Sequence, residues 1–71
     1  MNEEERTELG KRARSIIRSW EGDGYDNARE AWLDVDAVLE QRQYLDLEVA
    51  LQLDDIQSEA ARMVTRAHLG E

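Results

Sequence analysis

The stretch from Asp46 to His68 constrains the fold most, because apolar or small side chains recur along it in steps of three and four. These side chains are Val49, Leu53, Ile56, Ala60, Met63 and Ala67. No proline or glycine interrupts the pattern, which predicts one helix with Asp46 as its N-cap and Gly70 at its C-terminal end. A helix with a single apolar face cannot bury that face alone. The rest of the chain must therefore supply the covering surface.

A first helix is predicted over residues 3–21, with Asn2 as its N-cap and Gly22 as its stop. Its apolar positions again step by three and four, at Leu9, Ala13, Ile16, Ile17 and Trp20. Acidic residues precede basic ones along this segment, which suits the helix dipole and favours pairs such as Glu8 with Arg12.

A second helix is predicted over residues 26–42, after a glycine-rich turn in which Asp23 or Asp26 can act as the N-cap. Its apolar stripe comprises Ala28, Trp32, Val35 and Leu39. The pattern loses phase between residues 43 and 45, which indicates a short break before the third helix over residues 46–69. One continuous helix over residues 26–69 is the alternative, since no glycine or proline forces a turn.

Three amphipathic helices with short links predict an all-α fold, a small antiparallel three-helix bundle that occupies residues 1–71 as a single domain. The predicted core consists of Ile16, Trp20, Trp32, Val35, Leu39, Leu53, Ile56 and Met63. Leu33, Leu47 and Leu51 fall outside the three stripes. These three leucines form an apolar patch that is either a second side of the core or an association surface. Through an association surface the chain could also pair with itself as a homo-oligomer.

A formal net charge of −8 on 71 residues argues against direct binding to nucleic acid or to an anionic membrane. It favours a protein partner with a basic surface. No segment approaches the length and apolar content of a membrane span, and the acidic start of the chain is unlike a signal peptide. We therefore expect a cytoplasmic protein.

Catalytic and metal-binding patterns do not assemble in this sequence. A calcium loop beginning at Glu21 would need oxygen ligands where the chain has Tyr25 and Trp32. His68 is the only histidine and there is no cysteine, so neither a zinc or di-iron site nor a nucleophile with its base can be built. We expect no catalytic residue, no metal and no cofactor, and we predict that the protein is not an enzyme.

Carboxylates concentrate on the second and third predicted helices, at Asp34, Asp36, Glu40, Glu48, Asp54 and Asp55. We predict that this acidic face binds a partner protein, which would make the chain an adaptor or regulatory module. In composition the chain also resembles the small acidic phage or plasmid inhibitors of nucleases and defence complexes, and acidic immunity proteins. That resemblance implies an alternative function, in which the carboxylates mimic nucleic-acid phosphates and block a basic partner.

Overall fold

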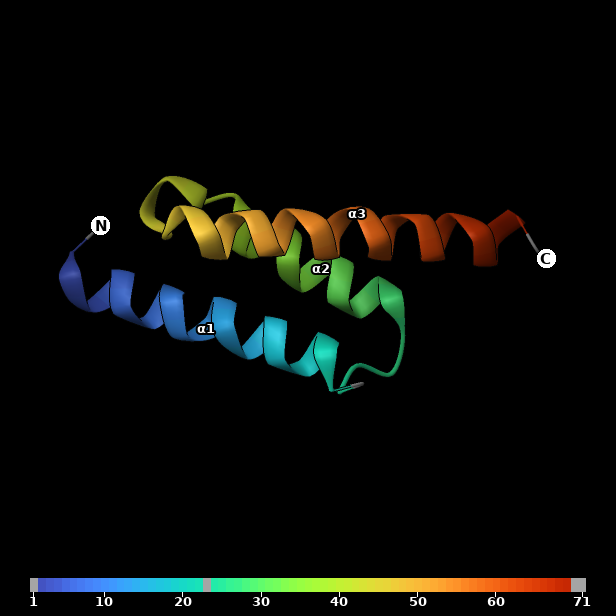
Figure 1. Ribbon diagram of the computed structural model, residues 1–71, viewed down its shortest axis with the longest axis horizontal. Helices are drawn as coiled ribbons and strands as arrows, with labels where there is room; N and C mark the ends of the chain where they lie inside the picture. Colours follow the sequence, from blue (N-terminus) through green and yellow to red (C-terminus); the bar gives the residue numbers. More distant parts are fainter. Residues whose placement is uncertain (1, 23, 70–71) are drawn as a thin grey trace.

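The structure, a computed structural model, describes residues 2–22 and 24–69, and for residues 67–69 the backbone alone. Within these ranges the chain forms the helices α1 (Glu3–Glu21), α2 (Ala28–Leu39) and α3 (Leu47–Leu69), with a short 3-10 helix, η1 (Arg42–Tyr44), before α3. α1 and α3 run in the same direction and α2 runs opposite to both (Figure 1). The predicted all-α three-helix bundle is confirmed. None of the described helices is long and apolar enough to cross a membrane.

The first helix has the predicted bounds and the predicted caps. The Asn2 side chain accepts a hydrogen bond of 2.8 Å from the Glu5 backbone N–H, which satisfies a donor of the first turn. At the other end the Gly22 N–H donates to the Arg18 carbonyl over 3.0 Å. The Glu8 carboxylate lies 3.8 Å from the Lys11 ammonium group. The spacing had indicated a pair with Arg12, the next residue.

The prediction for the second helix was wrong at both ends. Asn27, and not Asp26, is the N-cap, because its side chain accepts the Glu30 N–H over 3.0 Å. The other predicted cap, Asp23, lies outside the described residues. At its C-terminal end α2 stops at Leu39, and the chain tightens into η1. A single helix over residues 26–69 is thereby excluded.

The reversal between α2 and α3 has a physical cause in the side chains that follow α2. Tyr44 and Leu45 pack against the core from the short connection. The Tyr44 N–H donates to the Gln41 carbonyl over 3.0 Å, so the tightened backbone keeps its hydrogen bonds through the turn.

The third helix begins at Leu47, one residue after the predicted start, and the Asp46 carbonyl accepts the Ala50 N–H over 2.9 Å. The predicted C-terminal cap, Gly70, and the side chain of His68 lie outside the described residues. The last turns of α3 extend past the connection between α1 and α2 (Figure 1).

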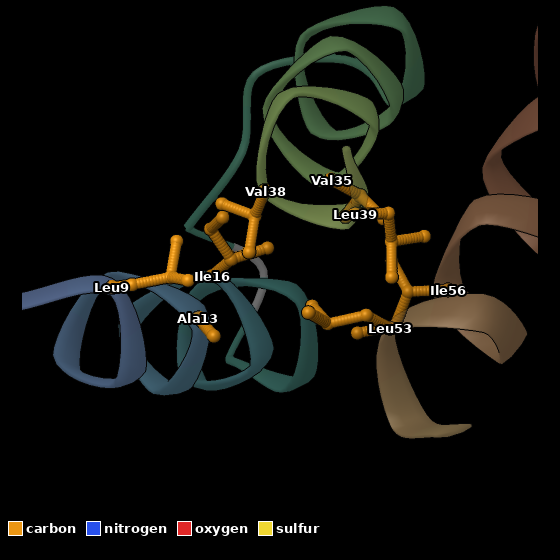
Figure 2. Close-up of a cluster of buried hydrophobic side chains, with 8 residues drawn as sticks. All are labelled: Leu9, Ala13, Ile16, Val35, Val38, Leu39, Leu53 and Ile56. Carbon is orange, nitrogen blue, oxygen red and sulfur yellow. The ribbon is translucent and has the colours of Figure 1, made fainter. Parts of the chain in front are cut away.

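All three helices contribute to one apolar core, whose side chains point into the space between them (Figure 2). The cluster comprises Leu9, Ala13 and Ile16 of α1, Val35, Val38 and Leu39 of α2, and Leu53 and Ile56 of α3. The predicted core residues Ile16, Val35, Leu39, Leu53 and Ile56 are therefore confirmed. Among the described residues every buried side chain is apolar.

Three residues of the predicted core lie at its margin. Trp20 and Trp32 are only partly buried, and Met63 is 48% exposed. The difference in helix length explains the position of Met63. At about 1.5 Å per residue, α2 spans roughly 18 Å and α3 roughly 35 Å, so the shorter helix leaves the far end of α3 uncovered.

Replacing Leu53 by alanine is expected to lower the free energy of unfolding by about 2–5 kcal/mol, because Leu53 is fully buried between all three helices and its truncation leaves a cavity. Urea unfolding followed by circular dichroism measures the change. Leu51→Ala, on the exposed side of the same helix, is the matched control and should change stability by no more than about 0.5 kcal/mol. Equal losses for the two variants would contradict the position of the core.

Replacing Asn27 by alanine is expected to destabilise the protein by about 1 kcal/mol, because the first turn of α2 loses its side-chain acceptor. Asp26→Ala should cost less, since Asp26 precedes the capping position. Thermal unfolding of the two variants, compared with the natural chain, distinguishes the two caps. A larger loss for Asp26→Ala would show that Asp26 is the cap after all.

Candidate functional site

The main exposed apolar feature of the described surface is a pair of leucines at the start of α3. Leu47 is 73% exposed and Leu51 is 52% exposed. Residues four apart lie one turn apart on the same side of a helix, so the two side chains are neighbours. We call them the leucine pair. Their exposure excludes the alternative in which they form a second side of the core.

Leu33, which the sequence grouped with this pair, is also half exposed, at 50%, but lies elsewhere. Gln57 donates a hydrogen bond of 3.2 Å to Asp36, and this contact sets the register between the antiparallel α2 and α3. In that register Leu33 lies at the level of residue 60 along α3, roughly 13 Å from the level of Leu51. The structure therefore does not bring Leu33 together with the leucine pair.

Three of the predicted acidic residues surround the leucine pair. Glu48, Asp54 and Asp55 occupy the positions three or four residues from Leu51 and so lie next to it on the surface of α3. Arg42 of η1 contacts the Asp54 carboxylate over 2.7 Å. Glu48 and Asp55 have no ion-pair partner of this kind within the described part of the chain. The rim of the leucine pair thus carries two carboxylates that form no direct ion pair with the described residues.

The other three predicted acids are Asp34 and Asp36 of α2 and Glu40, which directly follows it, and their contacts differ. Asp34 accepts a hydrogen bond of 3.0 Å from the Tyr25 hydroxyl, on the side of the connection between α1 and α2. Asp36 accepts from Gln57 and so faces α3. Positions two apart point to nearly opposite sides of a helix, which explains the separation. Glu40, one turn after Asp36, is exposed at the end of α2.

Tyr25 is a residue of interest that the sequence did not indicate. It lies in the connection between α1 and α2 and packs against the core. Burial raises the pKa of Tyr25 to about 12, and the hydrogen bond to Asp34 and the negative charge of that carboxylate act in the same direction. Tyr25 therefore stays a neutral donor that holds the connection against α2. The one sequence feature that could have indicated Tyr25 is its position directly after the glycine-rich turn.

A cleft of about 400 Å³ lies between α1 and the start of α3. Arg14 is 3.7 Å from the carboxylate of Asp46, and the Arg6 guanidinium lies 5.9 Å from the centre of the Tyr44 ring. Both cations thus have partners within the molecule. These contacts attach α1 to the residues preceding α3. We therefore assign them a role in holding the fold together and not in binding a ligand.

Among the described residues no group of three or more histidine, cysteine, aspartate or glutamate side chains is arranged to hold a metal ion. Comparison with protein-family models, with curated proteins and with solved structures finds no match for this chain. The candidate site therefore rests on its own geometry, which is an exposed apolar pair with a carboxylate rim.

Raising the pH should destabilise the protein from about pH 10 to about pH 12, because folding raises the pKa of Tyr25 from its ordinary value of 10.0 to about 12. The folded state therefore retains a proton that the unfolded state loses, so this contribution to stability is complete below pH 10 and disappears as the pH rises through 12. Asp34→Asn keeps a hydrogen-bond acceptor but removes the charge, and should lower the pKa of Tyr25. Ultraviolet absorbance of tyrosinate during a pH titration measures this, and an unchanged titration in the variant would contradict the contact.

Proposed function

We propose that this protein is a non-catalytic interaction module that binds a partner protein through the leucine pair. The observation that carries the proposal is the exposure of Leu47 and Leu51 inside a rim of Glu48, Asp54 and Asp55. Two apolar side chains of this size stabilise a complex by about 1.5–3 kcal/mol each when fully buried, whereas here they remain in water. A partner that covers them gains the share of this energy that corresponds to their exposed surface.

The rim indicates the chemistry of the partner. The free carboxylates of Glu48 and Asp55 favour a segment with lysine or arginine on either side of its apolar residues. A basic amphipathic helix meets this requirement, because its apolar residues recur at the same one-turn spacing as Leu47 and Leu51. A second copy of this chain is less suitable, since pairing the same surfaces would place Glu48 and Asp55 of both copies near one another.

The alternative function, inhibition by mimicry of nucleic acid, depends on charge instead of apolar contact. It requires carboxylates spaced along one surface, whereas Asp34 and Asp36, two positions apart, point to nearly opposite sides of α2. The two functions also differ in their response to salt, because screening weakens contacts between exposed charges far more than apolar ones.

The proposal predicts that a synthetic amphipathic helix with a leucine face and lysine flanks binds the chain, and that Leu51→Glu weakens binding at least about tenfold. The substituted carboxylate would be buried without a partner in the centre of the interface. Isothermal titration calorimetry measures the affinity. Leu33→Glu, at a leucine of similar exposure on α2, is the matched control and should change the affinity by less than about twofold.

A scrambled peptide of the same composition controls for attraction by charge alone. Equal binding of the scrambled peptide, or binding that survives Leu51→Glu, would refute the leucine pair as the binding surface. If binding disappeared at near-molar salt and in an Asp54→Asn, Asp55→Asn double variant, while Leu51→Glu retained it, the result would favour the nucleic-acid mimic. Light scattering of the chain alone, before peptide is added, should show a monomer.

A further inference from the structure

A notch of about 400 Å³ lies between the end of α1, the connection to α2 and the far half of α3. Its lining includes Trp20, Tyr25, Asp26, Ala28, Glu59 and Met63. We call it the aromatic notch. It combines two aromatic side chains and a thioether with two carboxylates, and no basic side chain of the described residues lines it. The notch is separate from the leucine pair, since Glu59 lies eight residues, or roughly 12 Å, beyond Leu51 along α3.

We propose that the aromatic notch binds an arginine side chain of a partner polypeptide. A guanidinium group stacks on aromatic faces and donates to carboxylates from the edge of the same plane, and the notch is lined by side chains of both kinds. A purely apolar occupant would fit less well, because it would remove water from Asp26 and Glu59 without replacing their hydrogen bonds.

Much of the notch is formed before any ligand binds. Trp20 and Tyr25 pack against the core, and the hydroxyl of Tyr25 donates to Asp34 over 3.0 Å, which fixes its ring. Met63 is 48% exposed at the open edge, where it can adjust to an occupant. Arg12, whose charge lowers the pKa of Tyr25, does not line the notch and leaves it open to an external cation.

The test uses a short capped peptide with a single arginine and a second peptide in which citrulline replaces it. Citrulline has nearly the shape of arginine without its charge. Nuclear magnetic resonance reports binding at the indole N–H groups of the two tryptophans of the chain. With the arginine peptide at millimolar concentration, the Trp20 signal should shift saturably. Trp32, which does not line the notch, serves as the internal reference and should not shift.

Two variants, each of which removes one carboxylate charge, test whether these carboxylates contribute to the binding that the Trp20 shift reports. Glu59→Gln and Asp26→Asn should each weaken binding by about threefold, as expected for an exposed ion pair. Glu4→Gln, an exposed carboxylate of α1 outside the notch, should leave the affinity unchanged. Equal shifts with the citrulline peptide, or an absence of saturation at Trp20, would overturn the proposal. Equally tight binding of a lysine peptide would overturn the assignment to a guanidinium group. Because the leucine pair lies elsewhere, none of these outcomes depends on it.

Discussion

Burial of the apolar stripe of α3 is the constraint on which the structure depends. A chain of 71 residues has room for one small core, and Leu53 and Ile56 of α3 meet side chains of both other helices there. Since the described buried side chains are all apolar, the core provides little directional bonding, and the arrangement of the helices is set by the fit of their side chains. The helix caps and the turn at η1 then determine where each helix can end.

The charges complete this arrangement at the surface. Ion pairs connect elements at the start of α3, where Arg14 approaches Asp46 and Arg42 approaches Asp54. Exposed pairs of this kind stabilise a fold by less than about 1 kcal/mol, so their main effect is on the distribution of the remaining charge. Arg42 pairs with Asp54, which leaves Glu48 and Asp55 as the rim carboxylates without a direct ion pair among the described residues.

The two candidate surfaces differ in how far the sequence could reveal them. Leu47 and Leu51 are close in the chain, and helical periodicity alone placed them together and off the buried stripe. Their exposure depended on whether another helix covered them, which periodicity does not describe. The aromatic notch could not be inferred in this way, because Trp20, Tyr25 and Met63 belong to three separate segments. The same limit applied to the acids, which share a charge but face different neighbours.

The sequence alone determined that this protein is an acidic chain of three amphipathic helices. It also located both ends of α1 and the start of α3 to within one residue. Local spacing and capping residues decide these features, because they act between residues a few positions apart. The early end of α2, the incomplete burial of the two tryptophans and the separation of Leu33 from the leucine pair were decided by tertiary structure. Each depends on the relative lengths and register of packed helices, which arise only when the apolar faces meet.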